Sequence, residues 1–373
     1  MDKYKCLMLS NVNGFSGIHG PIYKELNNEF DVSLVIDPFK VPIYRKINYF
    51  VKAFNHNKIE WLYRYRQALH IAKVTCSSFE ERTRYCEKEI AKFRGPYDFI
   101  FQLSSMFMLT KPIIYKPYFI YIDRTPKMAD MFYPKLLSHL SIEEKAMLNR
   151  FSELAFNNAS LIFTFNEITK ASLLKDYCIP SEKVFSVSSG VNVSDPQEIH
   201  GVKSKLVIAV CSDYYRHGGQ LCVDAFNLAS QKLPNVKFMY IGENLSNKKV
   251  NFETIRYLPY NELKKIYSIA SVSLMLSPLG GFQTITDSMA HKCVCLALKD
   301  NPYAKDVIKH GENGFMMTGN SKEISMKIIS IFNDKNNIVE KIGNEAFRYI
   351  YLNCTWKKVV NKISKHIKNY LSH

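Results

Sequence analysis

Apolar and polar positions along the chain follow two alternating patterns. Short apolar runs, typical of buried strands, are separated by longer segments in which apolar residues recur every three or four positions, as on one face of a helix. The predicted strands are 5–10, 32–36, 98–103, 118–123, 161–165 and 183–187 in the first half, and 205–210, 236–242, 272–276 and 293–298 in the second. This alternation predicts parallel sheets with helices on both faces.

A polar segment rich in turn formers, 188–205, separates the two series of strands and is predicted to be a linker. A chain of 373 residues also exceeds what one hydrophobic core usually supports. We therefore expect an α/β fold of two doubly wound, Rossmann-like domains that face a cleft, over 1–190 and 200–352, followed by a closing helix over 353–373. Ligands of such sheets bind beyond the carboxyl ends of the strands.

Glycines follow predicted strands at three places, each ahead of a predicted helix. The first loop contains Gly17 among three glycines, but its spacing does not match the dinucleotide fingerprint, so a plain tight turn is an equal alternative. The second loop contains Arg216, His217 and Gly218. Backbone N–H groups at a helix start bind anions, and an arginine side chain can donate a fork of hydrogen bonds to phosphate.

The third loop belongs to the stretch SPLGGFQTITDSMA, residues 277–290, which contains Gly280 and Gly281. The helix predicted after them carries Thr284 and Asp287 on one side, because they are three residues apart. A carboxylate at Asp287 can accept two hydrogen bonds from a vicinal diol such as a ribose. Together the loops predict a site for a phosphorylated nucleoside.

The charge distribution suggests a partner surface. The net charge is +16, and the segment 40–73 holds eight Lys and Arg against the single acid Glu60, interleaved with aromatic residues. This combination favours binding to an anionic membrane surface. A solvated face and a nucleic-acid site are alternatives, but no nucleic-acid motif accompanies the charge, so we expect no nucleic-acid partner.

Other features of the sequence bear on location and metal binding. No apolar run is long enough to span a bilayer, the N-terminus lacks a signal peptide, and the nine cysteines are scattered, which predicts a reducing cytoplasm. No His/Cys/Asp cluster has metal-ligand spacing, so neither a metal nor another cofactor is expected. We interpret four histidines as loop or surface residues: His19, His217, His291 and His310.

The second half of the chain resembles the nucleotide-sugar domain of GT-B glycosyltransferases, specifically glycosyltransferase family 4, also called glycosyl transferases group 1. The resemblance covers most of 205–320 and is carried by three segments, YRHGGQLCVDAFNLASQKLPNVKFMYIGE, LPYNELKKIYSIASVSLMLSP and GGFQTITDSMAHKCVCLALKDNPYAKDVIKHGENGFM. In the first half the glycine loop and YIDRTPKMADMFYP fit a subset of the family. The pair TW at 355–356 resembles the start of its closing helix, which crosses back to the first domain.

The resemblance implies a retaining, metal-independent transfer from a nucleotide diphosphate sugar, with UDP favoured. It places the donor on the second domain and the acceptor on the first. A lipid-linked saccharide at the cytoplasmic face of the cell membrane, in bacterial surface polysaccharide synthesis, would agree with the basic and aromatic segment 40–73. The expected location is therefore cytoplasmic and peripheral to that membrane.

The resemblance also implies roles for particular residues. Arg216 would hold the diphosphate and stabilise its developing charge, and Gly17 would let the first loop approach it. Asp287 would bind the ribose. The base would be lined by Leu258 and Leu263.

Asp123 occupies the region where many members carry a histidine near the reacting sugar, which makes it a catalytic candidate beside Arg216. An alternative is that Asp123 caps the helix or turn that begins at Thr125 and Pro126. Asp306 falls where a glutamate often follows the signature.

The sequence departs from the family pattern at two positions. The first acid of the Glu-x7-Glu pair is replaced by Leu279, or by Gly280 if one residue is deleted, and the lysine of the phosphate loop is replaced by His217. Contacts to the donor sugar must then come from the other domain or from residues at the start of the third helix, namely Gly280, Gly281, Phe282, Gln283 and Thr284. These departures favour the alternative of a noncatalytic GT-B protein that binds a nucleotide or glycan; a nucleic-acid-binding protein and a sugar-nucleotide epimerase are weaker alternatives.

Overall fold

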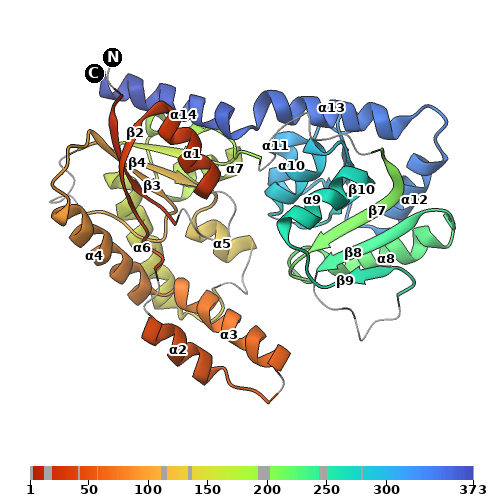
Figure 1. Cartoon of the computed structure of the whole chain (residues 1–373), viewed down its shortest axis with the longest axis horizontal. Helices are drawn as coiled ribbons and strands as arrows, with labels where there is room; N and C mark the ends of the chain where they lie inside the picture. The colour runs from red at the N-terminus through yellow and green to blue at the C-terminus, as the bar shows by residue number, and fades with distance from the viewer. Residues whose placement is uncertain are drawn as a thin grey trace. The chain divides into compact units, whose positions relative to one another are not determined.

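The computed structural model describes residues 3–11, 19–40, 43–56, 58–110, 116–132, 137–191, 202–242, 245, 250–278 and 280–372. The chain divides into two compact units, one of Met1–Ser188 with Val360–His373 and the other of Ser189–Val359. In Figure 1 each unit contains a sheet surrounded by helices. The last helix, α14 (Trp356–Leu371), begins in the second unit and ends in the first.

The first unit contains a parallel sheet of six strands in the order β2-β1-β3-β4-β5-β6. Its strands are β1 (Lys5–Leu9), β2 (Asp31–Ile36), β3 (Phe99–Leu103), β4 (Tyr118–Ile122), β5 (Leu161–Thr164) and β6 (Val184–Ser186). All six were predicted, with ends that differ by at most one residue. The order reverses between β1 and β3, and the loops that follow these strands therefore flank the usual ligand position of such a sheet.

Helices cover both faces of this sheet. They are α1 (His19–Glu29), α2 (Ile43–Lys52), α3 (Lys58–Lys73), α4 (Cys76–Lys92), α5 (Pro126–Phe132), α6 (Ile142–Asn158) and α7 (Glu167–Asp176). On one face, strand residues such as Leu7 and Ile120 pack with Phe156 of α6. On the other face, Tyr370 of α14 packs edge-on against Phe119 of β4, with ring centroids 5.5 Å apart. The end of α14 is thus part of the first core.

The second unit also contains a parallel sheet of six strands, in the order β12-β11-β10-β7-β8-β9. Its strands are β7 (Ser204–Cys211), β8 (Lys237–Gly242), β9 (Glu253–Ile255), β10 (Ala270–Met275), β11 (Val294–Leu298) and β12 (Phe315–Met317). The edge strands β9 and β12 were not predicted; each has three residues. The order reverses between β7 and β10.

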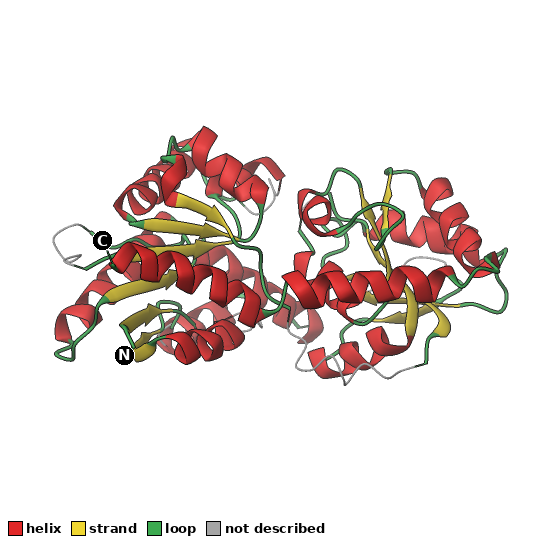
Figure 2. Ribbon diagram, turned by 90° about the horizontal axis from the view of Figure 1, so that it is seen from above, coloured by secondary structure: helices red, strands yellow, loops and turns green. Residues whose placement is uncertain are grey.

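The helices of the second unit are α8 (Gly219–Ser230), α9 (Tyr260–Ile269), α10 (Phe282–Ala290), α11 (Pro302–Val307), α12 (Ser321–Asn333) and α13 (Ile338–Asn353). Alternate residues of β7 face opposite sides of the sheet. Val207 packs into the core that α8 and α12 cover, and Ile208 packs with Tyr267 of α9. Figure 2 shows helices on both sides of the strands. The predicted fold class, two Rossmann-like domains, is confirmed.

A lysine from the predicted linker fixes the ends of two helices. The ammonium group of Lys203 donates hydrogen bonds to the carbonyl oxygens of Tyr267 (3.0 Å), Ala270 (2.7 Å) and His291 (2.5 Å). These carbonyls terminate α9 and α10, where a positive charge is favourable. Burial lowers the pKa of Lys203. The contact holds together two helices that carry candidate site residues.

Candidate active site

The loop after β7 requires glycine at two successive positions. Gly218 has a φ of +69°, and a Cβ atom built on it would lie 2.0 Å from the carbonyl oxygen of Leu276. A Cβ on Gly219 would lie 2.4 Å from the ring of Tyr214. The first turn of α8 therefore approaches the end of β10 more closely than any side chain allows.

Hydrogen bonds join this loop to the loop after β10. The hydroxyl of Ser277 donates to the carbonyl oxygen of Arg216 (2.9 Å). The side-chain amide of the buried Asn301 donates to the carbonyl oxygens of Ser277 (2.9 Å) and Gly280 (3.0 Å). The loops before α8, α10 and α11 are thus connected where the strand order reverses, which is the ligand position of doubly wound sheets.

Arg216 and His217 lie in the turn before α8. The backbone N–H of Arg216 donates to the Asp213 carboxylate (2.9 Å), and its guanidinium lies 4.0 Å from the same carboxylate. Burial, assisted by the charge of Arg216, lowers the pKa of His217 to about 4. His217 is therefore neutral at pH 7, in the place where the family pattern has a lysine. Its Nδ1 faces the backbone N–H of Asp213 (3.4 Å), which favours the tautomer protonated on Nε2.

The start of α10 resembles the start of α8, because a glycine with positive φ and no room for a Cβ atom comes directly before the helix. Gly281 has a φ of +73°, and a Cβ on it would lie 2.4 Å from the sulfur of Met275. Phe282 is buried, and Thr284 is half-buried. The side-chain amide nitrogen of Gln283 donates to the hydroxyl of Ser189 (3.1 Å) and the carbonyl oxygen of Gly190 (3.0 Å). Both hydrogens of the Gln283 side-chain amide are therefore used in hydrogen bonds within the second unit.

Asp287 is buried, with an exposed fraction of 4%. The hydroxyl of Tyr260, the first residue of α9, hydrogen-bonds to its carboxylate; burial and then the charge of Asp287 raise the pKa of this tyrosine. Tyr260 was not predicted as a site residue, although it lies in the segment LPYNELKK that carries part of the resemblance. Its partner could not be read from the sequence, because 27 positions separate the two residues.

Leu258 and Leu263 lie at the same end of α9. Both are half-buried and pack against the cluster that contains Tyr267 and Met239. Their proposed contact with the base stays a prediction.

Two of the histidines that were interpreted as loop or surface residues are buried or half-buried. His291 is 5% exposed at the C-terminal end of α10, where its Nδ1 lies 2.7 Å from the carbonyl oxygen of Asp287, and burial lowers its pKa to about 4. His19 is the first residue of α1 and is half-buried, with its Nδ1 2.7 Å from the Ser10 hydroxyl. Burial lowers the pKa of His19, while the charges of Asp37 and Asp123 oppose that shift. Each of these two buried or half-buried rings has a polar partner close to its Nδ1, the carbonyl oxygen of Asp287 for His291 and the hydroxyl of Ser10 for His19.

Asp123 lies in the first unit, directly after β4, and forms an ion pair with Arg124 (2.8 Å). The alternative that Asp123 caps the next helix is wrong, because the Thr125 hydroxyl accepts the N–H of Met128 (3.2 Å) at the start of α5. Its catalytic role stays a prediction. Gly17 and Leu279 lie outside the described residues.

Within the described ranges, no three His, Cys, Asp or Glu side chains gather as metal ligands would. No helix in the described part of the chain combines the length and the apolar character needed to cross a membrane.

Several solved structures are similar in fold to this chain. Anabaena HepE in complex with UDP and glucose has a TM-score of 0.62 and 14% identity, with 98% of this chain and 100% of that chain covered. Sucrose-phosphate synthase from Thermosynechococcus elongatus has a TM-score of 0.58 and 12% identity, with 79% of each chain covered. Staphylococcus aureus TarM, in complex with fondaparinux, α-GlcNAc-glycerol and UDP, has a TM-score of 0.56 and 14% identity, with 75% of this chain and 58% of that chain covered. The fold is therefore GT-B.

The sequence of residues 193–349 matches the family described as glycosyl transferases group 1. The resemblance stated from the sequence is therefore confirmed over residues 193–349. Among curated proteins, none matches the sequence.

Proposed function

We propose that the protein is a retaining, metal-independent glycosyltransferase that moves a hexosyl group from a UDP-sugar to a saccharide acceptor. The observation that carries this proposal is the joined pair of glycine loops at the reversal of the second sheet, inside a domain of the glycosyl transferases group 1 family. The choice of UDP is supported by the structural neighbour HepE, which has been solved with UDP-glucose.

In this proposal the start of α8 and the guanidinium of Arg216 bind the diphosphate. Charge accumulates on the diphosphate as the bond to the sugar breaks, and fixed donors directed at such charge are usually the largest catalytic contribution. The neutral His217 would donate one hydrogen bond through Nε2 without adding a charge. Donor affinity should therefore depend more on Arg216 than on His217.

Asp287 would bind the ribose. An ionised carboxylate offers about four acceptor positions, so it can retain the hydroxyl of Tyr260 while it accepts hydrogen bonds from a sugar. Tyr260 also fixes the carboxylate in one orientation. We accordingly assign Tyr260 a positioning role.

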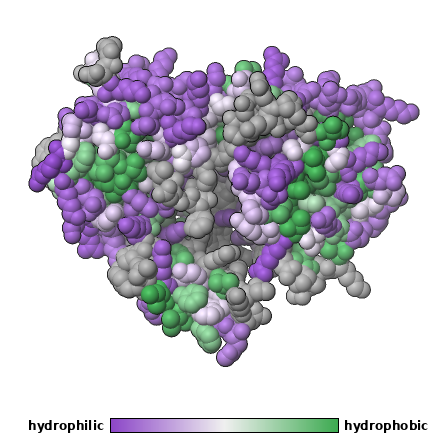
Figure 3. All heavy atoms as spheres, in the orientation of Figure 1, coloured by the Kyte–Doolittle hydropathy of each residue, from purple (hydrophilic) through white to green (hydrophobic). Residues whose placement is uncertain are grey.

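We further propose that the acceptor is lipid-linked, at the cytoplasmic face of the membrane, in bacterial surface polysaccharide synthesis. The support is an exposed apolar strip on α2 and just after it, made of Ile47 (59% exposed), Val51 (62%) and Phe54 (55%). Lys46 and Lys52 are exposed beside it. Figure 3 shows apolar surface over α2 and α3. Apolar residues flanked by cations are typical of segments that lie on anionic membranes.

The test is ligand-induced stabilisation followed by a transfer assay. UDP, GDP and CMP and their common sugars are added without metal to the wild type, to Asp287→Asn and to the control Asp300→Asn, which changes an exposed carboxylate. A ligand at a hundred times its Kd stabilises the folded state by about 2.7 kcal/mol. Stabilisation by one nucleotide, lost only in Asp287→Asn, supports the donor site. Failure of every nucleotide would refute the proposal.

A noncatalytic nucleotide-binding protein is the second candidate, because Leu279 replaces the first acid of the family's pair. It predicts that UDP binds while a radiolabelled UDP-sugar shows neither transfer nor hydrolysis. Turnover that is lost in Arg216→Gln and retained in Arg256→Gln, an exposed arginine, would exclude this candidate.

A further inference from the structure

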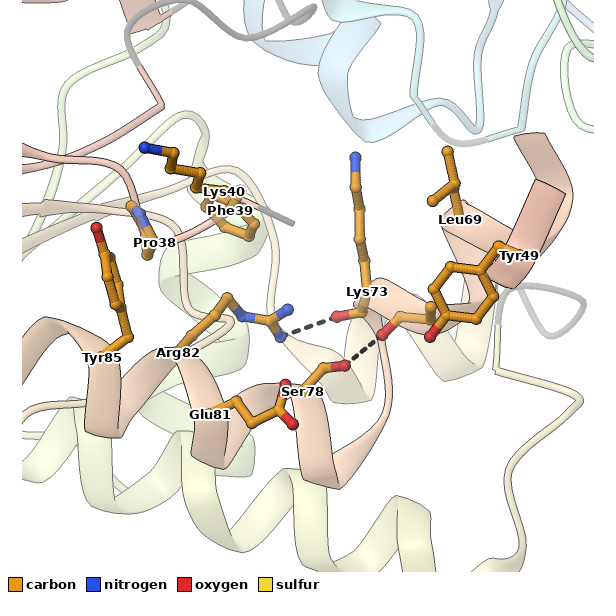
Figure 4. Close-up of a pocket in the computed structure, with 11 residues that line it drawn as sticks. Pro38, Phe39, Lys40, Tyr49, Leu69, Lys73, Ser78, Glu81, Arg82 and Tyr85 are labelled. Atoms are coloured by element: carbon orange, nitrogen blue, oxygen red, sulfur yellow. Dashed lines mark hydrogen bonds between the residues drawn. The ribbon is translucent and has the colours of Figure 1, made fainter. Parts of the chain in front are cut away.

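The first unit contains a pocket that the donor site does not use. Its volume is about 170 Å³. The loop after β2, the helices α2 and α3, and the first half of α4 enclose it (Figure 4). It can therefore hold one small group of a larger ligand.

A buried arginine lies at the centre of this pocket. Arg82 is only 8% exposed, and its guanidinium donates hydrogen bonds to the carbonyl oxygens of Met106 (2.9 Å) and Lys73 (2.8 Å). The guanidinium carbon lies 5.3 Å from the centre of the Phe39 ring. Burial lowers the pKa of Arg82 to about 10, which leaves it charged at neutral pH.

This charge lacks a close counter-ion. In the part of the chain that the structure describes, no carboxylate lies within 4.0 Å of the Arg82 guanidinium. Two carbonyl dipoles, an aromatic face and the more distant charge of Glu81 compensate it only in part. A buried cation is costly unless a partner of opposite charge is present.

The charged residues of the pocket lining also favour an anionic ligand. Lys40 and Lys73 are exposed, and in Figure 4 their ammonium groups extend to the same side of the pocket, above Arg82. The lining holds these three cations and one acid, Glu81. An incoming anion would therefore meet two exposed ammonium groups and, below them, a guanidinium. The planar set of N–H donors of a guanidinium suits phosphate and carboxylate oxygens.

Apolar and aromatic side chains complete the lining. Tyr49 of α2 and Leu69 of α3 stand on the side of the pocket opposite Tyr85 (Figure 4). Such side chains pack against the carbon-bound hydrogens of a sugar ring or of a glycerol unit. The pocket thus combines an anion-binding centre with walls for the carbon skeleton that carries the anion.

We propose that this pocket binds one anionic group of the acceptor, a phosphate or a sugar carboxylate. The proposal rests on the proposed function, since transfer requires a second substrate besides the nucleotide sugar. It names the chemical class of that substrate: an acidic saccharide or a phosphate-bearing one, in place of a neutral sugar.

The experiment is calorimetric titration, at saturating UDP so that the donor site is filled, with three probes: sn-glycerol 3-phosphate, methyl glucuronide and methyl glucoside. The proteins are the wild type, Lys40→Gln/Lys73→Gln, and the control Lys88→Gln/Lys175→Gln, which removes two exposed cations elsewhere in the first unit. We expect one anionic probe to bind the wild type and the control, and to bind at least tenfold more weakly to the Lys40/Lys73 variant. The neutral glucoside should give no signal. Arg82→Lys, which retains the charge and loses the fork, should also weaken binding.

Which anionic probe binds decides between phosphate and carboxylate. The proposal is overturned if neither anionic probe binds, or if the Lys40/Lys73 variant and the control bind equally well. It is also overturned if that variant loses only its binding to vesicles that contain phosphatidylglycerol, because the cations would then serve the membrane surface. Absence of UDP binding would instead refute the proposed function. In that case the same probes are titrated without UDP, and their binding or absence of binding still tests the proposed anion site.

Discussion

Gly218→Ala tests whether the close contact between the loops before α8 and α10 sustains both stability and donor binding. The added methyl group would lie 2.0 Å from the carbonyl oxygen of Leu276, a backbone atom of the residue directly after β10. The backbone at Gly218 would also have to keep a φ of +69°, which L side chains rarely adopt. Two separate costs therefore arise at one position.

Two other glycines separate these costs. Gly311 has a φ of +80° with no atom within 4 Å of the built Cβ, and Gly319 has open space and no positive φ. The left-handed conformation costs about 1–2 kcal/mol in a non-glycine residue, and reduced freedom of the unfolded chain returns about 0.4–1 kcal/mol. Gly311→Ala should thus destabilise by about 1 kcal/mol and Gly319→Ala should be neutral or slightly stabilising.

Gly218→Ala bears the same conformational cost and an overpacking cost of about 1–3 kcal/mol in addition. We expect a total loss of about 2–4 kcal/mol in the free energy of unfolding. The turn that carries Arg216 must move to relieve the contact. The Kd for UDP should therefore rise at least tenfold, while Gly311→Ala leaves it unchanged.

The assay is urea unfolding followed by circular dichroism, together with titration of UDP. If Gly218→Ala costs no more than Gly311→Ala, the contact with Leu276 contributes nothing and the reasoning fails. If stability falls as expected but UDP binds with unchanged affinity, the loop is structural only, and the donor assignment at α8 is wrong.

Three further outcomes are expected. Lys203→Met leaves three carbonyl oxygens at the ends of α9 and α10 without their donor and should cost about 2–4 kcal/mol in urea unfolding, whereas the exposed Lys205→Met should cost under about 0.5 kcal/mol. The pKa of His291 is about 4 in the folded state and about 6.5 ordinarily, so the unfolded chain takes up the proton first as the pH decreases. The free energy of unfolding should therefore fall by about 1.4 kcal/mol per pH unit between these two values. His291→Gln should show a smaller fall, and an equal fall would contradict this assignment. Val51→Ser/Phe54→Ser should reduce sedimentation with vesicles that contain phosphatidylglycerol at least fivefold without lowering UDP affinity, and unchanged sedimentation would remove the membrane proposal.

The fold could be predicted from the sequence because most of its strands are long apolar runs. The buried runs at β1 and β10, for example, stand out against polar flanks. The edge strand β12 was missed: it has only three residues, and it is defined by its pairing with β11, which the sequence does not show. The linker showed polar composition, but Lys203 within it contacts carbonyl oxygens 64, 67 and 88 positions away.

The candidate site was predicted where the chemistry is local. Adjacent glycines before a helix indicate a close backbone approach, and Gly218 and Gly281 both adopt the left-handed conformation that such turns need. The sequence could not show that Tyr260 orients Asp287, or that His217 is neutral. Both depend on burial and on neighbours that the fold supplies.

The pocket around Arg82 is the clearest case of a site without a sequence signal. Its guanidinium is held by backbone carbonyl oxygens of Lys73 and Met106, 9 and 24 positions away. Every residue has a backbone carbonyl oxygen, so the residue types at these two positions do not predict the hydrogen bonds to Arg82. Lys40 and Lys73 were grouped with a basic surface because the sequence shows their charge but not the enclosure beside them. In the described part of the chain no carboxylate lies within 4.0 Å of this ionised guanidinium, which is the reason to seek a closer partner in a substrate.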